Sequence, residues 1–175
     1  WEHNRIDCIQ DWVDEVDADA SRVHLQKSGW ISYDALLLAT GSTPNKFGWT
    51  GQELERVRGF YGLQDLEAIE EASRDLKTAV IVGGGLIGIE LAECLHSRGA
   101  RVVMLARESS YWNNILPAGE SRIINDEIRA SGIELRLESE LEEIVDDGKG
   151  AACAVKTKAG DRIDCQLVGL TAGVR

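Results

Sequence analysis

An α/β fold built on a parallel sheet is predicted for this chain by three observations. Residues 80–90, VIVGGGLIGIE, run from an apolar stretch through a glycine-rich turn into a helical pattern. A second apolar stretch follows at residues 101–105, and strand, turn, helix and strand within about thirty residues make a βαβ unit. A pattern of short strands also occurs twice, in residues 22–44 and 154–175. We therefore expect one complete domain and part of a similar one.

The repeated segments predict the strands that flank the βαβ unit. The first has a turn at Gly29 and ends on a buried strand at residues 35–40, followed by Gly41. The second has its turn at Gly160 and its buried strand at residues 167–172, followed by Gly173. An earlier strand is predicted before each segment, at residues 6–13 and 141–145. Each half thus has an antiparallel three-stranded meander that leads into a parallel strand.

Three helices are predicted between these segments. The first spans residues 62–76, where Gly62 and Asp65 form a possible start. The second follows the glycine turn, with Arg98 in its last turn and Gly99 as its cap, and the third stops at Gly132 before a strand at residues 133–137. Their apolar stripes are Leu66, Ile69, Ala72 and Leu76, then Ile87, Leu91 and Leu95, then Ile123, Ile124 and Ile128. The breaker-rich residues 41–51 are expected to be a linker.

The glycine turn has the pattern that holds a dinucleotide, G-x-G-x-x-G. Gly83 permits a tight turn, Gly85 removes the side chain that would keep backbone N–H groups from a pyrophosphate, and Gly88 lets the helix pack close to the strand. The helix N-terminus then faces the negative charge. A glycine turn that arises by chance is the alternative for an isolated match, but here the flanking strands and helix agree with the motif.

Coenzyme choice is expected to depend on the end of the second strand, at residues 106–108. An Asp or Glu there binds the ribose hydroxyls of NAD, whereas an Arg accommodates the 2′-phosphate of NADP. Ala106 occupies the expected acidic position, Arg107 follows it, and Glu108 has the opposite charge. We therefore expect NADPH to bind at least as well as NADH.

Composition excludes several classes of function. The chain has 175 residues, 43% hydrophobic and 28% charged, and no apolar run near the about 20 residues that a membrane span requires. Its formal net charge of -11 argues against nucleic acid or an anionic membrane as a partner, and its acidic stretches are expected to be solvated. Four scattered cysteines indicate reduced, buried thiols of a cytoplasmic protein, and neither they nor the histidines have metal-type spacing.

Three motifs in this order resemble the FAD-dependent pyridine nucleotide-disulfide oxidoreductase family. YDALLLATGSTP, residues 33–44, is similar to the end of the family's first FAD segment. VIVGGGLIGIELAE, residues 80–93, is similar to its pyridine nucleotide turn, and VGLTAGVR, residues 168–175, to the closing strand of its NAD(P)H domain. SYWNNILP, residues 110–117, is closer to the branch of rubredoxin reductase, NADH oxidase and nitrite reductase flavoproteins.

The resemblance implies further site residues. Glu90 would face the nicotinamide near the flavin, with an ordinary exposed helix glutamate as the alternative. Leu86 stands where some relatives have a tyrosine over the flavin, and a packing role is expected for it. Thr40 and Gly41 would lie near the flavin, and Ala172 and Gly173 at the equivalent place in the second domain, unless both pairs are structural strand ends. The expected cofactor-binding residues are Gly83, Gly84, Gly85, Leu86, Ile87, Gly88, Glu90, Ala106, Arg107, Glu108, Ala172, Gly173, Thr40 and Gly41.

The same resemblance implies the domain organisation. Residues 1–45 would be a remnant of an FAD-binding domain, residues 46–76 a linker and connecting helix, and residues 77–175 the NAD(P)H-binding domain. That domain is expected to be Rossmann-like and three-layered, with a parallel sheet and a β-meander crossover.

The activity implied is transfer of hydride from NAD(P)H to FAD and of electrons to an acceptor. The family's FAD glycine turn, redox-active cysteine and dimerisation domain have no match here, so the chain alone is expected to bind nucleotide without turnover. No catalytic residue or metal ligand is assigned. The expected partners are a small-molecule dinucleotide, an electron acceptor of unknown kind and, through residues 1–44, a second copy of the chain. A dinucleotide sensor and a purely structural module are the alternatives.

Overall fold

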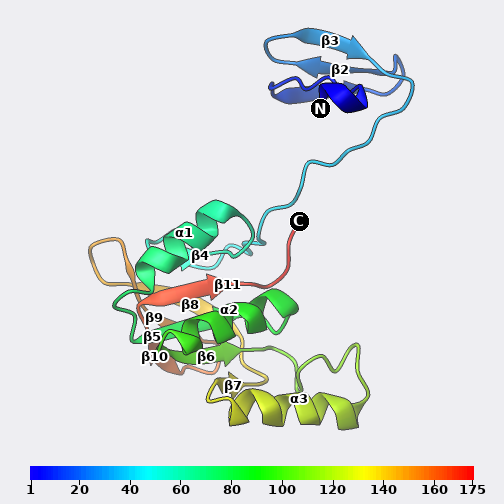
Figure 1. Cartoon of the computed structure of the whole chain (residues 1–175). Helices are drawn as coiled ribbons and strands as arrows, with labels where there is room; N and C mark the ends of the chain where they lie inside the picture. Colours follow the sequence, from blue (N-terminus) through cyan, green and yellow to red (C-terminus); the bar gives the residue numbers. More distant parts are fainter. The chain divides into compact units, whose positions relative to one another are not determined.

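The structure is a computed structural model that describes the backbone of residues 1–175 and every side chain except that of Glu2. The chain divides into two compact units, Trp1–Gly41 and Ser42–Arg175 (Figure 1). Residues 46–76, which the sequence assigns to a linker and connecting helix, lie within the second unit.

The first unit is a three-stranded antiparallel meander. A 3-10 helix, η1 (Glu2–Asn4), precedes its strands, which pair in the order β1-β2-β3. These strands are β1 (Val13–Asp17), β2 (Arg22–Leu25) and β3 (Gly29–Ser32). Among the described side chains of this unit, Leu25 is the only buried hydrophobic one, so the meander has almost no apolar core.

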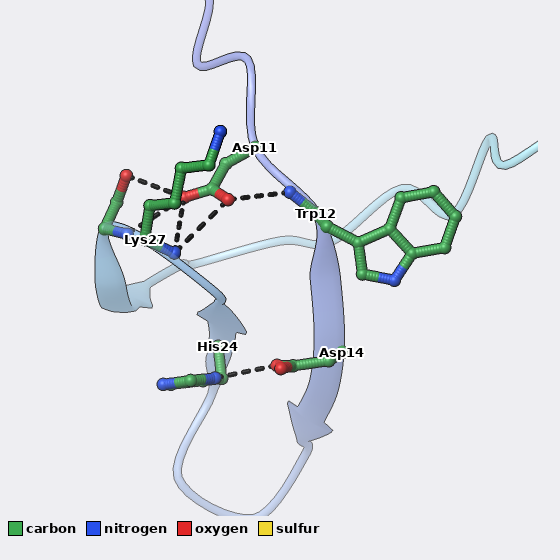
Figure 2. Close-up of polar contacts among 6 residues, drawn as sticks. Asp11, Trp12, Asp14, His24 and Lys27 are labelled. Carbon is green, nitrogen blue, oxygen red and sulfur yellow. Dashed lines mark hydrogen bonds and ion pairs between the residues drawn. The ribbon is translucent and has the colours of Figure 1, made fainter.

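Polar contacts stabilise the meander in the absence of a larger core. Figure 2 shows the Asp11 carboxylate accepting hydrogen bonds from the backbone N–H groups of Trp12, at 2.8 Å, and Lys27, at 3.0 Å. On the strands, His24 Nδ1 lies 2.7 Å from Asp14 Oδ1. Asp11 therefore fixes the turn between β2 and β3 against the chain that enters β1.

Two strands predicted in this unit are wrong. β1 begins at Val13 instead of covering residues 6–13, and residues 35–40 form no strand. A strand needs a neighbour for its backbone hydrogen bonds, and no described strand pairs with residues 35–40. Leu37 is accordingly 87% exposed. The repeat is nevertheless visible in the backbone, because Gly41 and Gly173 both have positive φ, 75° and 89°.

The second unit is built on a five-stranded parallel sheet with the order β4-β11-β5-β6-β7. From β5 the chain adds β6 and β7 on one side, and an antiparallel meander, β8 to β10, then returns it to the other side as β11. The bounds are β4 (Val57–Arg58), β5 (Thr78–Val82), β6 (Arg101–Leu105), β7 (Glu134–Arg136), β8 (Leu141–Asp146), β9 (Ala152–Thr157), β10 (Arg162–Asp164) and β11 (Leu167–Leu170). The strand order reverses beside β5, where open α/β sheets bind ligands.

The sheet is the middle one of three layers, and both of its faces are buried. On one face Val80 packs in a cluster with Ile144 and Val155 of the meander. On the other face Ile81 packs with Leu91 of α2 (Leu86–Ser97), the helix that lies across the sheet in Figure 1. Successive residues of β5 therefore supply both cores, which explains its continuous apolar run. The predicted three-layer fold with a meander crossover is confirmed.

The predicted helix starts are more accurate than the predicted helix ends and buried faces. In α1 (Leu63–Ala72) the Asp65 carboxylate accepts a 3.0 Å hydrogen bond from the Gly62 N–H, as expected, but the helix ends before Leu76. In α3 (Ala118–Ala130) Ile128 is buried and Ile124 packs against the same core cluster, whereas Ile123 is 69% exposed, so only Ile123 departs from the predicted stripe. The polar residues Ser121 and Asn125 take the buried positions.

The cysteines do not share one environment. Cys165 is buried, and burial raises the pKa of its thiol to about 12. Cys8 and Cys94 are exposed and Cys153 is half-buried, so the expectation of four buried thiols is wrong. Within the described part of the chain, no group of three or more His, Cys, Asp or Glu side chains could hold a metal ion. No helix among the described residues combines the length and apolarity needed to cross a membrane.

Candidate functional site

A pocket of about 540 Å³ lies at the carboxyl ends of β5, β6 and β11. The glycine turn forms one wall, the segment after β6 a second, and the segment after β11 a third. Aromatic and charged side chains complete the rim. The lining residues are Phe47, Trp49, Val82, Gly83, Gly84, Gly85, Leu105, Arg107, Glu108, Trp112, Asn114, Ile115, Ser139, Glu140, Leu141, Lys158, Thr171, Ala172 and Gly173.

The first glycine of the turn is held between β6 and β11. Gly83 has a φ of 125°, which L side chains rarely adopt, and its N–H donates a 3.0 Å hydrogen bond to the Leu105 carbonyl. A Cβ at Gly83 would lie 2.6 Å from the Thr171 carbonyl oxygen. Thr171 in turn donates through its N–H to the Val82 carbonyl at 2.9 Å. The turn is therefore fixed by contacts with both neighbouring strands.

The other two motif glycines differ in what surrounds them. A Cβ at Gly88 would lie 2.5 Å from the Gly83 carbonyl oxygen, so glycine is needed for α2 to approach the strand. A Cβ at Gly85 would meet nothing within 4 Å, although Gly85 lines the pocket. The absence of a side chain at Gly85 thus keeps open space next to the backbone rather than permitting a packing contact.

The N-terminus of α2 is suited to an anion. Gly85 is the N-cap and supplies no side-chain hydrogen bond, and the first turn contains no acidic residue. The first N–H groups of a helix have no acceptor within the helix, and they carry the positive end of its dipole. A phosphate at this position would be bound by backbone N–H groups alone.

Tyr111 supports the turn from the segment after β6. Its hydroxyl donates a 2.8 Å hydrogen bond to the Gly85 carbonyl, and its own N–H donates to Asn125 Oδ1 at 2.9 Å. Burial raises the pKa of Tyr111 to about 12, so the hydroxyl remains a donor at neutral pH. The buried Asn125 and Ser121 of α3 complete this polar network, which explains why polar residues face inward on that helix.

We expect Tyr111→Phe to lower the free energy of unfolding by about 1 kcal/mol, the net contribution of one hydrogen bond. The Gly85 carbonyl keeps its 3.2 Å hydrogen bond from the Ile89 N–H, so the turn should persist. Urea unfolding measures the change in stability. Tyr33→Phe, in the other unit, is the control, and an equal loss of stability there would contradict the role of the hydroxyl.

The structure brings together some of the residues expected at the site. Gly83, Gly84, Gly85, Arg107, Glu108, Ala172 and Gly173 line the pocket, whereas Leu86, Ile87, Gly88, Glu90 and Ala106 do not. Leu86 is 59% exposed, so it has little packing contact within this chain. Glu90 is exposed on α2. Thr40 and Gly41 belong to the first unit.

Several lining residues were missed in the sequence. Trp49 lies in the stretch that was expected to be a linker, and Glu140 in an acidic stretch that was expected to be solvated. Lys158 comes from the turn between β9 and β10. The predicted meander was a sequence signal for Glu140 and Lys158. A crossover that returns to the sheet must bring its connecting turns near the edge of the site.

Comparison with known proteins identifies a family and a fold. A family model described as pyridine nucleotide-disulphide oxidoreductase matches residues 2–175. The chain is 30% identical over 176 residues to a nitrite reductase [NAD(P)H] of Bacillus subtilis, an alignment that covers 100% of the chain and 22% of that protein. The chain therefore spans about a fifth of the length of this relative.

Two solved structures have the same fold. A ferredoxin reductase from Rhodopseudomonas palustris superposes with a TM-score of 0.91 at 24% identity, over 99% of this chain and 43% of that one. An engineered water-forming NADPH oxidase bound to NADPH superposes with a TM-score of 0.82 at 26% identity, over 93% of this chain and 37% of that one. Its five substitutions include aspartate to alanine and, at the next position, alanine to arginine.

Proposed function

Because the chain belongs to the pyridine nucleotide-disulphide oxidoreductase family, we propose that it is the NAD(P)H-binding part of a flavin-dependent oxidoreductase. The pyrophosphate lies over Gly83, Gly85 and the start of α2, the adenosine points toward Arg107, and the nicotinamide points toward Glu90. The observation that carries this proposal is the open space at Gly85 beside two glycines that are tightly packed. Residues 77–175 are the coenzyme-binding domain, and residues 1–45 are a piece of the flavin domain.

The residues of the pocket fit a pyridine dinucleotide in three respects. The backbone approach at Gly85 is unobstructed, the helix N-terminus has no side-chain cap, and a cation, Arg107, lies on the rim. Bound NAD(P)H would supply the hydride for the reaction of the complete enzyme. The residues of this chain hold and orient it: backbone N–H groups bind the diphosphate, and the Tyr111 hydroxyl adds a hydrogen bond to the Gly85 carbonyl of the turn.

The residues do not provide an equivalent cradle for FAD. The sequence contains one G-x-G-x-x-G turn, at residues 83–88, and the proposal assigns it to NAD(P)H. Thr40 and Gly41 are proposed to lie near the flavin in the complete enzyme, which passes electrons on to its acceptor. The chain alone binds nucleotide without turnover.

The end of β6 favours NADPH at least as much as NADH. Ala106 has no carboxylate that would repel a 2′-phosphate, and Arg107 next to it is 79% exposed in its side chain. Arg107 Nε lies 3.0 Å from Glu108 Oε1, a surface ion pair that contributes little and can be exchanged for a phosphate. The alanine–arginine pair has the same order as the pair introduced in the engineered NADPH oxidase.

We expect Arg107→Ala to weaken NADPH binding about tenfold, because one charge-assisted hydrogen bond of about 1.5 kcal/mol or more is lost. NADH, which lacks the 2′-phosphate, should be affected by less than about twofold. Calorimetric titration of the chain with each coenzyme measures both. Arg98→Ala, an exposed arginine at the end of α2, is the control. A clear NADH preference that is unchanged in Arg107→Ala would overturn the assignment of the 2′-phosphate.

The same titration separates the proposed function from its alternatives. A purely structural module has no affinity for either coenzyme. A dinucleotide sensor binds at least one of the two coenzymes, but a complete protein with such a sensor domain would not transfer hydride to bound flavin. Stopped-flow measurement of flavin bleaching by NADPH in the complete protein therefore distinguishes a sensor from an oxidoreductase.

A further inference from the structure

Four charged residues meet at one corner of the pocket. Arg107 and Glu108 follow β6, Glu140 precedes β8, and Lys158 follows β9, and all four line the pocket. They form two ion pairs, Arg107 with Glu108 at 3.0 Å and Lys158 Nζ with Glu140 Oε2 at 2.6 Å. Two positive and two negative groups thus lie around the position proposed for the adenosine.

Backbone hydrogen bonds hold the three segments together. The Ser139 N–H donates to the Ala106 carbonyl at 2.9 Å, and the Glu138 N–H donates to the Glu108 carbonyl at 2.9 Å. On the other side, the Lys158 N–H donates to the Glu140 carbonyl at 3.0 Å. The positions of Arg107, Glu140 and Lys158 are therefore fixed relative to one another by the main chain, even though their side chains are exposed.

The side chains influence one another electrostatically. The hydrogen bond and charge of Lys158 lower the pKa of Glu140, and the more distant charge of Arg107 lowers it further. Glu140 is therefore ionised at neutral pH and neutralises Lys158. In this state Lys158 is unavailable to an anion unless Glu140 releases it, and that release costs little for a surface pair.

We infer that Lys158 is a second phosphate-binding cation and that Glu140 competes with the 2′-phosphate for it, so that this ion pair sets the preference between NADPH and NADH. The inference rests on the proposed function and adds to it a determinant outside the segment after β6. With NADPH, the 2′-phosphate lies between Arg107 and Lys158 and replaces the Glu140 carboxylate. With NADH, the Lys158–Glu140 pair remains intact.

The chain contains a matched control pair. Lys156 Nζ lies 2.9 Å from Glu143 Oε2, and these residues lie within β9 and β8, the strands next to Lys158 and Glu140. Neither of them lines the pocket. Changes to this pair alter the net charge of the protein by the same amount as changes to Lys158 and Glu140, but not the charge at the proposed 2′-phosphate position.

The test is calorimetric titration of the 175-residue chain and its variants with NADPH and with NADH. Lys158→Met should weaken NADPH binding about tenfold and change NADH binding by less than about twofold, and Glu140→Gln should strengthen NADPH binding about threefold. Lys156→Met and Glu143→Gln should change neither affinity beyond the general effect of net charge. Far-UV circular dichroism of each variant checks that the fold is kept.

The outcomes that overturn the inference differ from those that overturn the proposed function. If Lys158→Met weakens the binding of both coenzymes equally, or weakens NADPH binding no more than Lys156→Met does, Lys158 does not bind the 2′-phosphate. The proposed coenzyme site is not contradicted by that result. An unchanged NADPH affinity in Glu140→Gln shows that Glu140 does not compete. If the unmodified chain binds neither coenzyme, the proposed function fails and the inference fails with it.

Discussion

Gly85→Val is expected to abolish NAD(P)H binding while the protein remains folded. The backbone of Gly85 has φ -96° and ψ 179°, an extended conformation that valine adopts readily, and its Cβ would point into open space. The branched side chain would occupy the space through which the pyrophosphate reaches the first N–H groups of α2. Loss of two charge-assisted hydrogen bonds of about 1.5 kcal/mol each predicts an affinity reduced by roughly a hundredfold or more.

The experiment compares Gly85→Val with Gly119→Val by calorimetric titration and thermal unfolding. Gly119 lies in the first turn of α3, outside the pocket, and its Cβ would also meet nothing within 4 Å. Both variants should unfold within a few degrees of the unmodified chain, and only Gly85→Val should lose the coenzyme. Unchanged affinity in Gly85→Val would mean that the dinucleotide does not lie over this turn.

Gly83→Ala is expected to cause a large loss of stability. Two effects combine there: alanine is strained at a φ of 125°, and its Cβ would lie 2.6 Å from the Thr171 carbonyl oxygen. Backbone strain of about 1–2 kcal/mol and overpacking of about 1–3 kcal/mol together predict a decrease of about 3 kcal/mol in the free energy of unfolding. Urea titration followed by circular dichroism measures the change.

Gly99→Ala separates the two effects. Gly99 also has a positive φ, 90°, but a Cβ there would meet nothing within 4 Å, so only the strain of about 1–2 kcal/mol should remain. A Gly83→Ala variant no less stable than Gly99→Ala would show that the turn can move away from β11. That result would contradict the rigidity of the turn on which the proposed coenzyme site depends.

The parts of the fold that follow from local pattern were predictable from the sequence. The strand before Gly83, the helix that stops before Gly99 and the start of α1 after Gly62 were found because each depends on residues next to one another in the chain. Ile123 shows the limit of this reasoning. Its place in an apolar cluster suggested burial, but Asn125 is buried instead, because its amide accepts a hydrogen bond from a distant segment.

Tertiary context also decides which of the two repeated segments forms a strand at its end. Residues 35–40 and 167–172 have similar sequences, but residues 167–170 lie between β4 and β5, whereas residues 35–40 pair with no described strand. An apolar sequence gives a strand its preference, and a neighbour gives it its hydrogen bonds. Only the preference can be read from the sequence.

The candidate site divides in the same way. Gly83, Gly85 and Arg107 were found because a motif places them within one βαβ unit. Trp49, Glu140 and Lys158 were missed because each is far from that motif in sequence and reaches the pocket through the meander. Backbone contacts between the segments after β6, before β8 and after β9 bring Glu140 and Lys158 to the rim, and a hydrogen bond from the Ile144 N–H to the Thr50 carbonyl places the stretch that contains Trp49 beside β8.

The most direct test of the central claim is a crystal structure of the chain grown with NADPH. The diphosphate should lie within hydrogen-bond distance of the backbone N–H groups at residues 84–86, with the 2′-phosphate beside Arg107. A coenzyme bound elsewhere on the molecule, or a side chain closing the space at Gly85 at saturating NADPH, would contradict it.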